Sequence, residues 1–259
     1  MAAAALITGA SSGLGEEFAL QLARAKRELV LVARREDRLR DVADRAKKAG
    51  APNATIICSN LGRSDAAHEV HQQVTAAGIS VDYLVNNAGF GTHGNFAQAP
   101  LERELEQINL NVSALVALTR LFLSGMVAAG RGHIINVAST AAFQPVPWMA
   151  TYAATKAFVL NFSEALSSEL QGTGVTVLAL CPGPTRTEFQ QVAGVEDSGV
   201  PSFAYMDAAT VVRQGIDAAR RGKALRVNGL VNSLMAQSTR LAPRALVRRI
   251  AGAMFRGDV

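Results

Sequence analysis

The chain alternates between short apolar runs and longer amphipathic stretches from its first residues almost to its end. Seven apolar runs have the length of buried strands, at residues 5–8, 28–33, 54–58, 82–87, 133–138, 175–181 and 224–227. Several of these runs are continuous Val, Ile and Leu, which is typical of strands that helices cover on both faces. Segments with helical periodicity lie between them, including residues 16–25, 35–50, 100–130 and 151–172. The alternation therefore predicts an α/β fold, a doubly wound parallel sheet of about seven strands with helices on both faces.

No linker, internal repeat or low-complexity tract interrupts this alternation, so a single domain over residues 1–259 is expected. A composition of 49% hydrophobic and 18% charged residues is that of a globular chain that can bury one large core. Residues 184–206 break the regular pattern, since they follow a strand, have no strong period and contain two glycines and two prolines. Long irregular segments are more often functional than structural, so we interpret 184–206 as a substrate lid in preference to a variable surface loop.

The excess positive charge of the chain is concentrated at its C-terminus. The whole chain has a net charge of +5; from Arg240 onward five arginines and one aspartate give +4, which leaves +1 for the rest. The body of the chain has no basic stripe interleaved with aromatic residues, as nucleic-acid-binding proteins have. Nucleic acid is therefore not an expected partner.

The C-terminal tail, residues 241–259, is predicted to form a basic amphipathic helix. Leu246, Val247, Ile250 and Met254 recur on one side of it, whereas its arginines fall largely elsewhere. We expect this helix to pack on the domain or on a partner subunit. Contact with an anionic membrane surface is the less favoured alternative.

The sequence predicts no membrane span, metal site or disulfide. No run of 18 or more uninterrupted apolar residues occurs, and the first apolar run leads into a glycine turn without the basic residues of a signal peptide. Cys58 and Cys181 are far apart, lie in apolar runs and make no CxxC or zinc pattern. We interpret them as buried free thiols in a reducing compartment, and expect a cytoplasmic location.

The first strand runs directly into the glycine-rich turn TGASSGLG, residues 8–15, and a helix follows at once. Gly9, Gly13 and Gly15 let the backbone turn tightly and approach a pyrophosphate with no Cβ in the way. The free N–H groups and positive dipole at the start of the following helix favour the same anion. A glycine-rich turn alone is a weak signal, but its place between the first strand and the first helix predicts a dinucleotide site.

Arg34 and Arg35 follow the second strand, about 20 residues beyond the glycine turn, where a dinucleotide-binding fold meets the adenosine ribose. An acidic residue there would accept hydrogen bonds from the ribose of NAD, whereas two arginines offer charge and paired donors to the 2′-phosphate of NADP. The alternative is a solvated helix start in which Glu36 and Asp37 pair with the arginines. The helix dipole does not favour basic side chains at a helix N-terminus, so we expect NADP(H) as the cofactor.

The segment YAATK places Tyr152 and Lys156 four residues apart, on one face of a helix. Ser139 lies thirteen residues before the tyrosine, at the carboxyl end of the run 133–138. Ligands of open α/β sheets bind outside those strand ends, so the three polar side chains can converge there. Each has an ordinary structural explanation when taken singly, and Ser139 could be a plain turn residue. Together they favour a catalytic group.

Five segments together give the chain a resemblance to the short-chain dehydrogenase/reductase family, in its short single-domain form. They are TGASSGLG, NNAG at 86–89, INLNV at 108–112, Ser139 with YAATK, and PGPTRT at 182–187. Each segment is weak to moderate alone, but all five occur in order at ordinary spacings. The resemblance covers about residues 4–230, and it implies a Rossmann-type fold and an oxidoreductase that acts on CH–OH groups.

The resemblance also implies roles for individual residues. Tyr152 would protonate the substrate carbonyl oxygen as hydride arrives from the nicotinamide. Lys156 would lower the pKa of that phenol, which is about 10 in a free tyrosine, and would hold the nicotinamide ribose. Ser139 would bind the substrate oxygen, and Asn111 would belong to a proton relay. Asn111 could equally be a polar residue that is hydrogen-bonded inside an apolar helix.

The cofactor-binding residues that the resemblance implies follow the same segments. They are Gly9, Ser11, Ser12, Gly13, Leu14, Gly15, Arg34, Arg35, Asn60, Leu61, Asn87, Ala88, Gly89, Tyr152, Lys156, Pro182, Gly183, Thr185 and Thr187. One position departs from the family pattern, since Asn60 stands where an acidic residue usually contacts the adenine amine. Its amide oxygen can accept the same hydrogen bond.

These features predict an NADP(H)-dependent carbonyl reductase, reversible as an alcohol dehydrogenase, for a hydrophobic ketone, aldehyde or 3-oxoacyl-type substrate. The residues expected around the substrate are Phe90, His93, Phe143, Trp148, Phe189 and Phe203. The alternative from another class is a sensor or scaffold that binds NADP(H) without turnover. An isomerase or dehydratase is less favoured because an added substrate domain is lacking. The two longest predicted helices are apolar enough to favour a homodimer or homotetramer, as in much of the family.

Overall fold

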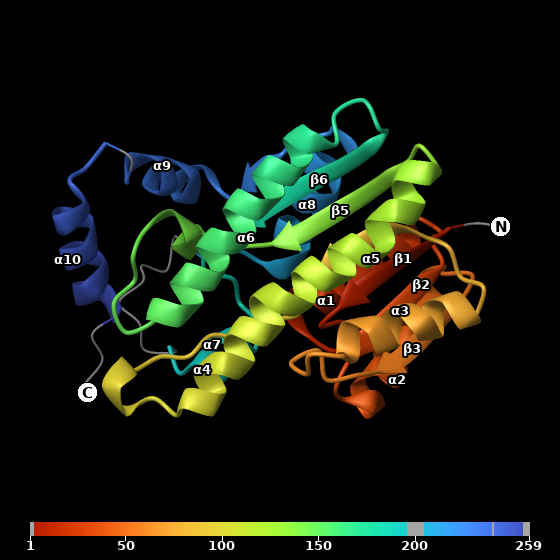
Figure 1. Ribbon diagram of the computed structural model, residues 1–259, viewed down its shortest axis with the longest axis horizontal. Helices are drawn as coiled ribbons and strands as arrows, with labels where there is room; N and C mark the ends of the chain where they lie inside the picture. Colours follow the sequence, from red (N-terminus) through yellow and green to blue (C-terminus); the bar gives the residue numbers. More distant parts are fainter. Residues whose placement is uncertain (1–2, 196–204, 240, 256–259) are drawn as a thin grey trace.

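The computed structural model describes residues 3–195, 205–239 and 241–255, and its centre is a seven-stranded sheet (Figure 1). The strand order is β3-β2-β1-β4-β5-β6-β7, and every neighbouring pair is parallel. The strands are β1 (Ala4–Thr8), β2 (Leu29–Ala33), β3 (Ala54–Cys58), β4 (Val81–Asn86), β5 (Gly132–Val137), β6 (Val175–Cys181) and β7 (Leu225–Val227). The doubly wound parallel sheet predicted from the sequence is confirmed, and each strand end lies within one residue of its expected place.

Helices connect the strands and cover both faces of the sheet (Figure 1). They are α1 (Gly13–Arg24), α2 (Glu36–Ala49), α3 (Ala66–Ala76), α4 (Leu101–Ile108), α5 (Ala114–Ala128), α6 (Ala150–Glu169), α7 (Phe189–Ala193), α8 (Ala208–Arg220), α9 (Leu230–Ser238) and α10 (Arg244–Phe255). Short 3₁₀ turns occupy Phe96–Gln98 and Thr140–Phe143, and a π-helical turn occupies Asn109–Ser113. The first of the two longest predicted helical segments is therefore α4, the π turn and α5 in succession.

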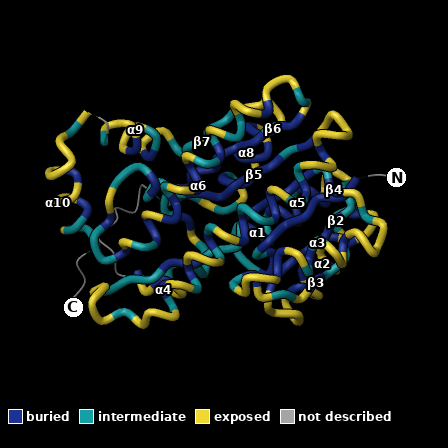
Figure 2. The backbone as a smooth tube through the Cα atoms, viewed as in Figure 1, coloured by how far each residue is buried: buried dark blue, intermediate teal, exposed yellow. Residues whose placement is uncertain are grey.

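Each face of the sheet has its own hydrophobic core, because successive residues of a strand point to opposite faces. Ile7 and Leu31 pack in one core with residues of α1, α2 and α8. Their neighbours Leu6 and Val30 pack in the other core with residues of α3 and α5. Figure 2 shows the strands buried and the exposed residues on the outer sides of helices and in loops. Burying each such side chain contributes about 1.5–3 kcal/mol, so the two cores fix the sheet on which the site is built.

The direction in which strands are added reverses at β1. The chain continues outward to β2 and β3 on one side and then returns to place β4 on the other. The connections that follow β1 and β4 therefore diverge, which opens a crevice at the carboxyl ends of these strands. The glycine-rich turn lies at this point, where Gly9 has a left-handed φ of +64° and a Cβ on Gly15 would lie 2.1 Å from the Gly9 carbonyl oxygen. Asn87 closes the turn from the β4 side by donating from Nδ2 to the Thr8 carbonyl oxygen at 2.9 Å.

A buried polar network fixes the ends of β4 and β5 against the helices beside them. Asn86 Nδ2 donates to Asn136 Oδ1 at 2.9 Å and to Thr119 Oγ1 at 3.0 Å. Asn136 Nδ2 donates to Ser163 Oγ at 2.9 Å. Buried polar groups are costly unless they are hydrogen-bonded, so these contacts allow little freedom in how β4, β5, α5 and α6 meet.

The helix over Leu101–Ala128 is long and apolar enough, by length and composition, to cross a membrane. The core helix of a soluble protein meets the same criteria. Here the α5 part packs against α3, β4 and β5, and 39% of the most apolar window is buried inside the protein. Its apolar residues therefore contribute to the core on this face of the sheet.

The prediction that both cysteines are buried is wrong for Cys58. Cys181 is buried at the end of β6, whereas Cys58 is exposed. Cys58 is the last residue of β3, an edge strand of the sheet, and its Sγ lies 3.2 Å from the Arg34 carbonyl oxygen. Edge strands lack a neighbour on one side, so the apolar run at 54–58 did not imply complete burial of its last residue.

The C-terminal tail forms α10, which packs on the domain. Val247 and Ala251 are buried, and the Phe255 carbonyl oxygen lies 2.7 Å from His93 Nε2. Leu246 and Ile250, which the periodicity placed on the apolar side, are 50% and 54% exposed. The contact follows the narrower stripe of Val247, Ala251 and Phe255, so the apolar side of this helix is only partly covered.

The close approach of Gly15 to Gly9 predicts opposite effects for two glycine-to-alanine changes. Gly15→Ala puts a methyl group 2.1 Å from a backbone carbonyl oxygen, and overpacking of this kind costs about 1–3 kcal/mol of unfolding free energy. Gly125→Ala, on the exposed side of α5, meets nothing within 4 Å. It should stabilise the protein by about 0.5–1 kcal/mol. Urea denaturation checks both values, and an unchanged unfolding free energy for Gly15→Ala would contradict the packing of the turn.

Candidate active site

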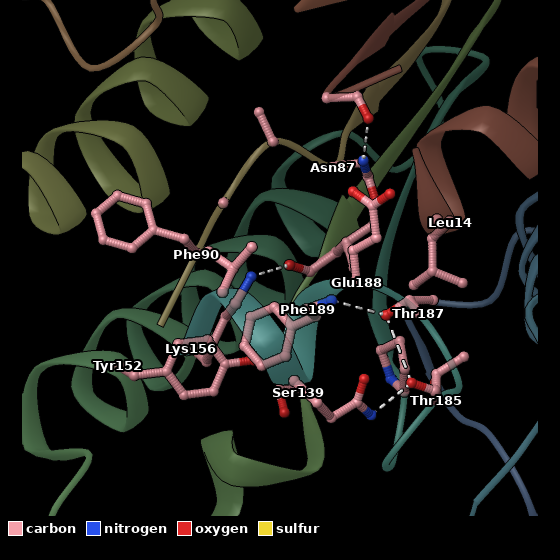
Figure 3. A pocket seen from close by; sticks show the side chains of 18 of the residues that line it. Leu14, Asn87, Phe90, Ser139, Tyr152, Lys156, Thr185, Thr187, Glu188 and Phe189 are labelled. Atoms are coloured by element: carbon pink, nitrogen blue, oxygen red, sulfur yellow. Dashed lines mark hydrogen bonds between the residues drawn. The ribbon is translucent and has the colours of Figure 1, made fainter. Parts of the chain in front are cut away.

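A cavity of about 440 Å³ opens at the carboxyl ends of the strands, where the chain order reverses (Figure 3). The glycine-rich turn, Arg34 and Arg35 form part of its wall. Ser139, Tyr152 and Lys156 form another part. The two groups of residues that the sequence singled out separately, one for a dinucleotide and one for chemistry, therefore line a single cavity.

Tyr152 and Lys156 lie one turn apart on α6, and both are buried at the cavity wall, at 8% and 6% exposure. Lys156 Nζ donates to the Val137 carbonyl oxygen, the last of β5, at 2.7 Å. The same Nζ lies 5.8 Å from the centre of the Tyr152 ring. The end of β5 thus holds the ammonium group beside the phenol.

Ser139 lies two residues after the end of β5 and is the N-cap of the 3₁₀ turn Thr140–Phe143. Its Oγ accepts a hydrogen bond from the Ala141 N–H at 3.1 Å, so Ser139 does stabilise this turn, as the alternative interpretation expected. The hydroxyl can still donate, because it has one proton and two lone pairs. Figure 3 shows Ser139, Tyr152 and Lys156 at the same cavity.

Asn111 does not line the cavity but is buried directly behind it, in the π-helical turn. Its Oδ1 accepts from the Phe90 N–H at 3.1 Å, and its Nδ2 donates to the Phe90 carbonyl oxygen and to Thr155 Oγ1, each at 3.0 Å. A Cβ on Gly89 would lie 2.9 Å from Asn111 Oδ1 and 3.6 Å from Lys156 Nζ. Asn111 therefore joins the loop after β4 to α6, and Gly89 provides the space that this contact needs.

Burial is the largest cause of the pKa shifts of the ionisable groups in this site. It raises the pKa of Tyr152 to about 12, and the hydrogen bond with Ser139 offsets part of that rise. Burial also lowers the pKa of Lys156 to about 8 and raises that of the neighbouring Cys181 thiol to about 12. The lowering that Lys156 is expected to exert on this pKa stays a prediction, since burial is the largest cause of the net rise. The phenol is therefore protonated at neutral pH, which is the form that donates a proton.

The two arginines after β2 lie at the dinucleotide end of the cavity. Arg35 Nη2 donates to Ser11 Oγ at 3.2 Å and to Ser12 Oγ at 2.9 Å, so this guanidinium lies against the glycine-rich turn. Arg34 Nη1 lies 3.5 Å from Glu106 Oε1. Glu36, which the alternative explanation paired with these arginines, pairs with Arg40 instead.

The loop after β6 covers the cavity between these two ends. Thr185 pairs with Met206 in an isolated parallel bridge, and Phe189 begins α7. The Phe189 ring lies 5.3 Å from the Tyr152 ring, centre to centre. Residues 196–204, which include Phe203, lie outside the described residues. The lid function assigned to 184–206 stays a prediction, although the described part of this segment forms one wall of the cavity.

Most residues expected at the site line the cavity. They are Gly9, Ser11, Ser12, Gly13, Leu14, Arg34, Arg35, Asn60, Leu61, Asn87, Ala88, Gly89, Phe90, Ser139, Tyr152, Lys156, Pro182, Gly183, Thr185, Thr187 and Phe189. Gly15 lies behind the turn, against the Gly9 carbonyl oxygen. Asn60 is exposed, and its Oδ1 accepts from the Gly62 N–H at 3.2 Å, so its amide oxygen already has a partner within its own loop.

Three of the expected substrate residues are placed elsewhere. His93 binds the carbonyl oxygen of Phe255 and so fastens the end of α10. Phe143 packs in the core cluster of α5 and α6 that contains Leu115. Trp148 has a left-handed φ of 69°, and its carbonyl oxygen accepts from the Gly94 N–H at 2.9 Å. These aromatic residues were selected by their nearness in sequence to the strand ends, which does not determine the direction of a side chain in an irregular loop.

The cavity also includes residues to which no individual role was assigned from the sequence, six of them within 184–206. They are Val32, Ala33, Ser59, Leu110, Val137, Ala138, Thr140, Ala141, Gln144, Val146, Met149, Pro184, Glu188, Gln190, Val192, Val195, Tyr205 and Phe255. Phe255 comes from the C-terminal helix, more than 100 residues after Tyr152. Glu188 directly follows PGPTRT and so lay next to a recognised segment, but no partner was expected for it.

Known proteins resemble this chain in sequence and in fold. The family model for short chain dehydrogenases matches residues 3–197. Ketoacyl reductase HetN from Nostoc sp. is 34% identical over 199 residues, which cover 73% of this chain and 69% of that protein.

Two solved structures have the same fold over nearly the whole chain. A short-chain dehydrogenase from Sphingobium yanoikuyae in complex with NADPH has a TM-score of 0.82 at 32% identity, over 92% of this chain and 94% of that one. The bulky-bulky ketone specific alcohol dehydrogenase from Comamonas testosteroni has a TM-score of 0.78 at 29% identity, over 92% of each chain. Together with the family model and the Rossmann-type sheet, these matches show that the chain belongs to the short-chain dehydrogenase/reductase family of oxidoreductases.

Proposed function

We propose that this protein is an NADP(H)-dependent carbonyl reductase, reversible as an alcohol dehydrogenase, for a hydrophobic ketone, aldehyde or 3-oxoacyl-type substrate. The observation that carries the proposal is that Ser139, Tyr152 and Lys156 line the same cavity as Arg34 and Arg35. A ketoacyl reductase, an NADPH complex and a ketone-specific alcohol dehydrogenase among the similar proteins support the same class of reaction.

The wall of the cavity fits a dinucleotide. Gly9 and Gly13 have left-handed φ values of +64° and +58°, which favour glycine and leave the backbone accessible. The N-terminus of α1 begins at Gly13, so its unpaired N–H groups and dipole favour a pyrophosphate there. Arg34 and Arg35 lie where the adenosine ribose of such a ligand is expected, and their charge favours a 2′-phosphate. NADPH, when bound, would supply the hydride for reduction of the carbonyl.

Tyr152 would donate its phenolic proton to the carbonyl oxygen of the substrate. The raised pKa keeps that proton on the phenol, and the Ser139 hydroxyl can donate a second hydrogen bond as negative charge develops on the same oxygen. The ammonium of Lys156, held 5.8 Å from the ring centre, would stabilise the phenolate that remains. Asn111 holds the Phe90 backbone and Thr155 in place behind this group.

The cavity wall near the phenol supports a hydrophobic substrate. The apolar residues there come from four parts of the chain: Phe90, Val146, Met149, Phe189 and Phe255. Val146, Met149 and Tyr152 belong to one buried cluster, on which Phe189 and Phe255 pack. Sites lined by apolar side chains with a few converging polar groups are typical of small-molecule binding. The substrate would therefore place its carbonyl at Ser139 and Tyr152 and its apolar part along this cluster.

Replacing the phenolic hydroxyl tests the assignment of the proton donor. Tyr152→Phe should lower kcat for ketone reduction by at least about 100-fold, the usual range for loss of a general acid, and should leave NADPH binding intact. Tyr83→Phe is the matched control, because the Tyr83 hydroxyl is buried away from the cavity and lacks a hydrogen-bond partner among the described residues. Turnover of a panel of apolar ketones checks both. NADPH binding without turnover in the wild-type protein would favour the sensor alternative.

The lowered pKa of Lys156 predicts how reduction depends on pH. The ammonium is charged below about pH 8 and neutral above it, whereas the Tyr152 phenol keeps its proton to about pH 12. The kcat/KM for reduction should therefore fall as pH rises through about 8, because a neutral amine no longer stabilises the phenolate. A rate profile from about pH 6 to about pH 10 checks this. Lys156→Arg should remove that step, since a guanidinium stays charged; a flat wild-type profile would refute the role of the ammonium.

Charge reversal after β2 tests the choice of cofactor. The double change Arg34→Asp and Arg35→Asp removes the expected partners of a 2′-phosphate and supplies carboxylates to a ribose hydroxyl. The ratio of the Kd for NADH to the Kd for NADPH should fall by at least about tenfold, since hydrogen bonds to charged groups contribute about 1.5–3 kcal/mol each. Calorimetric titration with both cofactors measures the ratio. An unchanged NADPH affinity would show that the phosphate binds elsewhere.

A further inference from the structure

Both oxygens of the Glu188 carboxylate are bound by arginines of α2 and of the segment before it. Glu188 Oε2 lies 3.3 Å and 3.4 Å from Nη1 and Nη2 of Arg35, and Oε1 lies 2.5 Å from Nη1 of Arg38. The two arginines are three residues apart, so their side chains can reach the same side of the helix start. Glu188 comes from the loop after β6, on the opposite half of the sheet.

The Arg35–Glu188 ion pair lies in the wall of the cavity beside the glycine-rich turn, where a dinucleotide is expected. Arg35 and Glu188 both line it, and Arg35 also contacts the hydroxyls of Ser11 and Ser12 on the glycine-rich turn. A Cβ on Gly13 would lie 3.3 Å from the Thr187 side chain, so the residue before Glu188 already lies close to the same turn. Figure 3 shows Thr187, Glu188 and Phe189 at this cavity. An acidic residue of the loop thus occupies guanidinium groups at the place where a cofactor phosphate is expected.

A carboxylate and a phosphate monoester compete for the same partner. Both accept paired hydrogen bonds from a guanidinium, and a phosphate monoester has a charge of about −1.5 to −2 at neutral pH. Arg38 and Arg35 lower the pKa of Glu188, so its carboxylate is ionised in the same range. A 2′-phosphate that approaches Arg35 therefore meets a negative charge already bound to it.

We propose that Glu188 is a specificity-determining residue, whose carboxylate competes with the cofactor 2′-phosphate for Arg35 and so limits the preference for NADP(H) over NAD(H). The inference rests on the proposed NADP(H) site, and Arg38, which is not part of the cavity wall, holds the other oxygen of the Glu188 carboxylate. The side chains of Arg35 and Glu188 are 43% and 41% exposed, so solvent weakens their attraction. Exposed pairs of this kind correspond to about a two- to fivefold change in affinity.

The test compares ligands that differ only in the 2′-phosphate. The probes are NADP⁺ with NAD⁺, and 2′,5′-ADP with 5′-AMP, titrated into the full-length protein by calorimetry. Glu188→Gln removes the charge and keeps the shape of the side chain. It should tighten NADP⁺ and 2′,5′-ADP by about two- to fivefold and leave NAD⁺ and 5′-AMP within about 1.5-fold.

Glu69→Gln is the matched control, because Glu69 is also 41% exposed and paired with an arginine, Arg63 at 2.8 Å, outside the cavity. It should change none of the four affinities. Unchanged NADP⁺ affinity in Glu188→Gln would overturn the inference. Weaker binding of all four ligands would also overturn it, since Glu188 would then stabilise the bound nucleotide instead of competing with its phosphate. A wild-type protein that binds NADP⁺ no better than NAD⁺ would instead refute the proposed NADP(H) site itself.

Discussion

The burial of a lysine ammonium beside a tyrosine phenol is the constraint on which the arrangement of this site depends. A buried charge is costly unless it is bound, and Lys156, at 6% exposure, donates to the carbonyl oxygen that ends β5. Ser139 follows two residues later on the same chain segment. One strand end therefore supplies both the anchor of the ammonium and the hydroxyl, and the first turn of α6 brings the phenol to them.

The rest of the fold serves to fix that strand end. The Asn86–Asn136 hydrogen bond ties β5 to β4, and Asn111 ties the loop after β4 to α6 through Thr155. These contacts need glycine at Gly89, where a Cβ would collide with Asn111 Oδ1. A second set of close approaches, around Gly9, shapes the turn at the end of β1. The catalytic residues and the glycine-rich turn therefore share one feature: both are packed at strand ends where neighbouring parts of the chain approach closely.

The sequence predicted those parts of the site that are set by strand ends and helix periodicity. Tyr152 and Lys156 follow from one helix face and Ser139 from the end of a strand, so local pattern and sheet topology determine their meeting. The residues that form the rest of the cavity wall could not be predicted from local pattern or from sheet topology. Phe255 reaches it through the packing of α10, whereas His93 and Phe143 are drawn into contacts with α10 and the core. The net rise in the pKa of Tyr152 could not be predicted either, because burial can be measured only once the chain is folded around the phenol.

In the proposed reaction one substrate oxygen meets the Tyr152 phenol and the Ser139 hydroxyl at once, with the Lys156 ammonium behind them. A crystal structure with NADP⁺ and a poorly reactive apolar ketone measures this directly. We expect the ketone oxygen to lie within about 2.6–3.2 Å of both Tyr152 Oη and Ser139 Oγ, and the apolar part of the ketone to lie against Met149 and Phe189. A ketone bound with its oxygen directed away from Tyr152, in a cavity that also holds the dinucleotide, would contradict it.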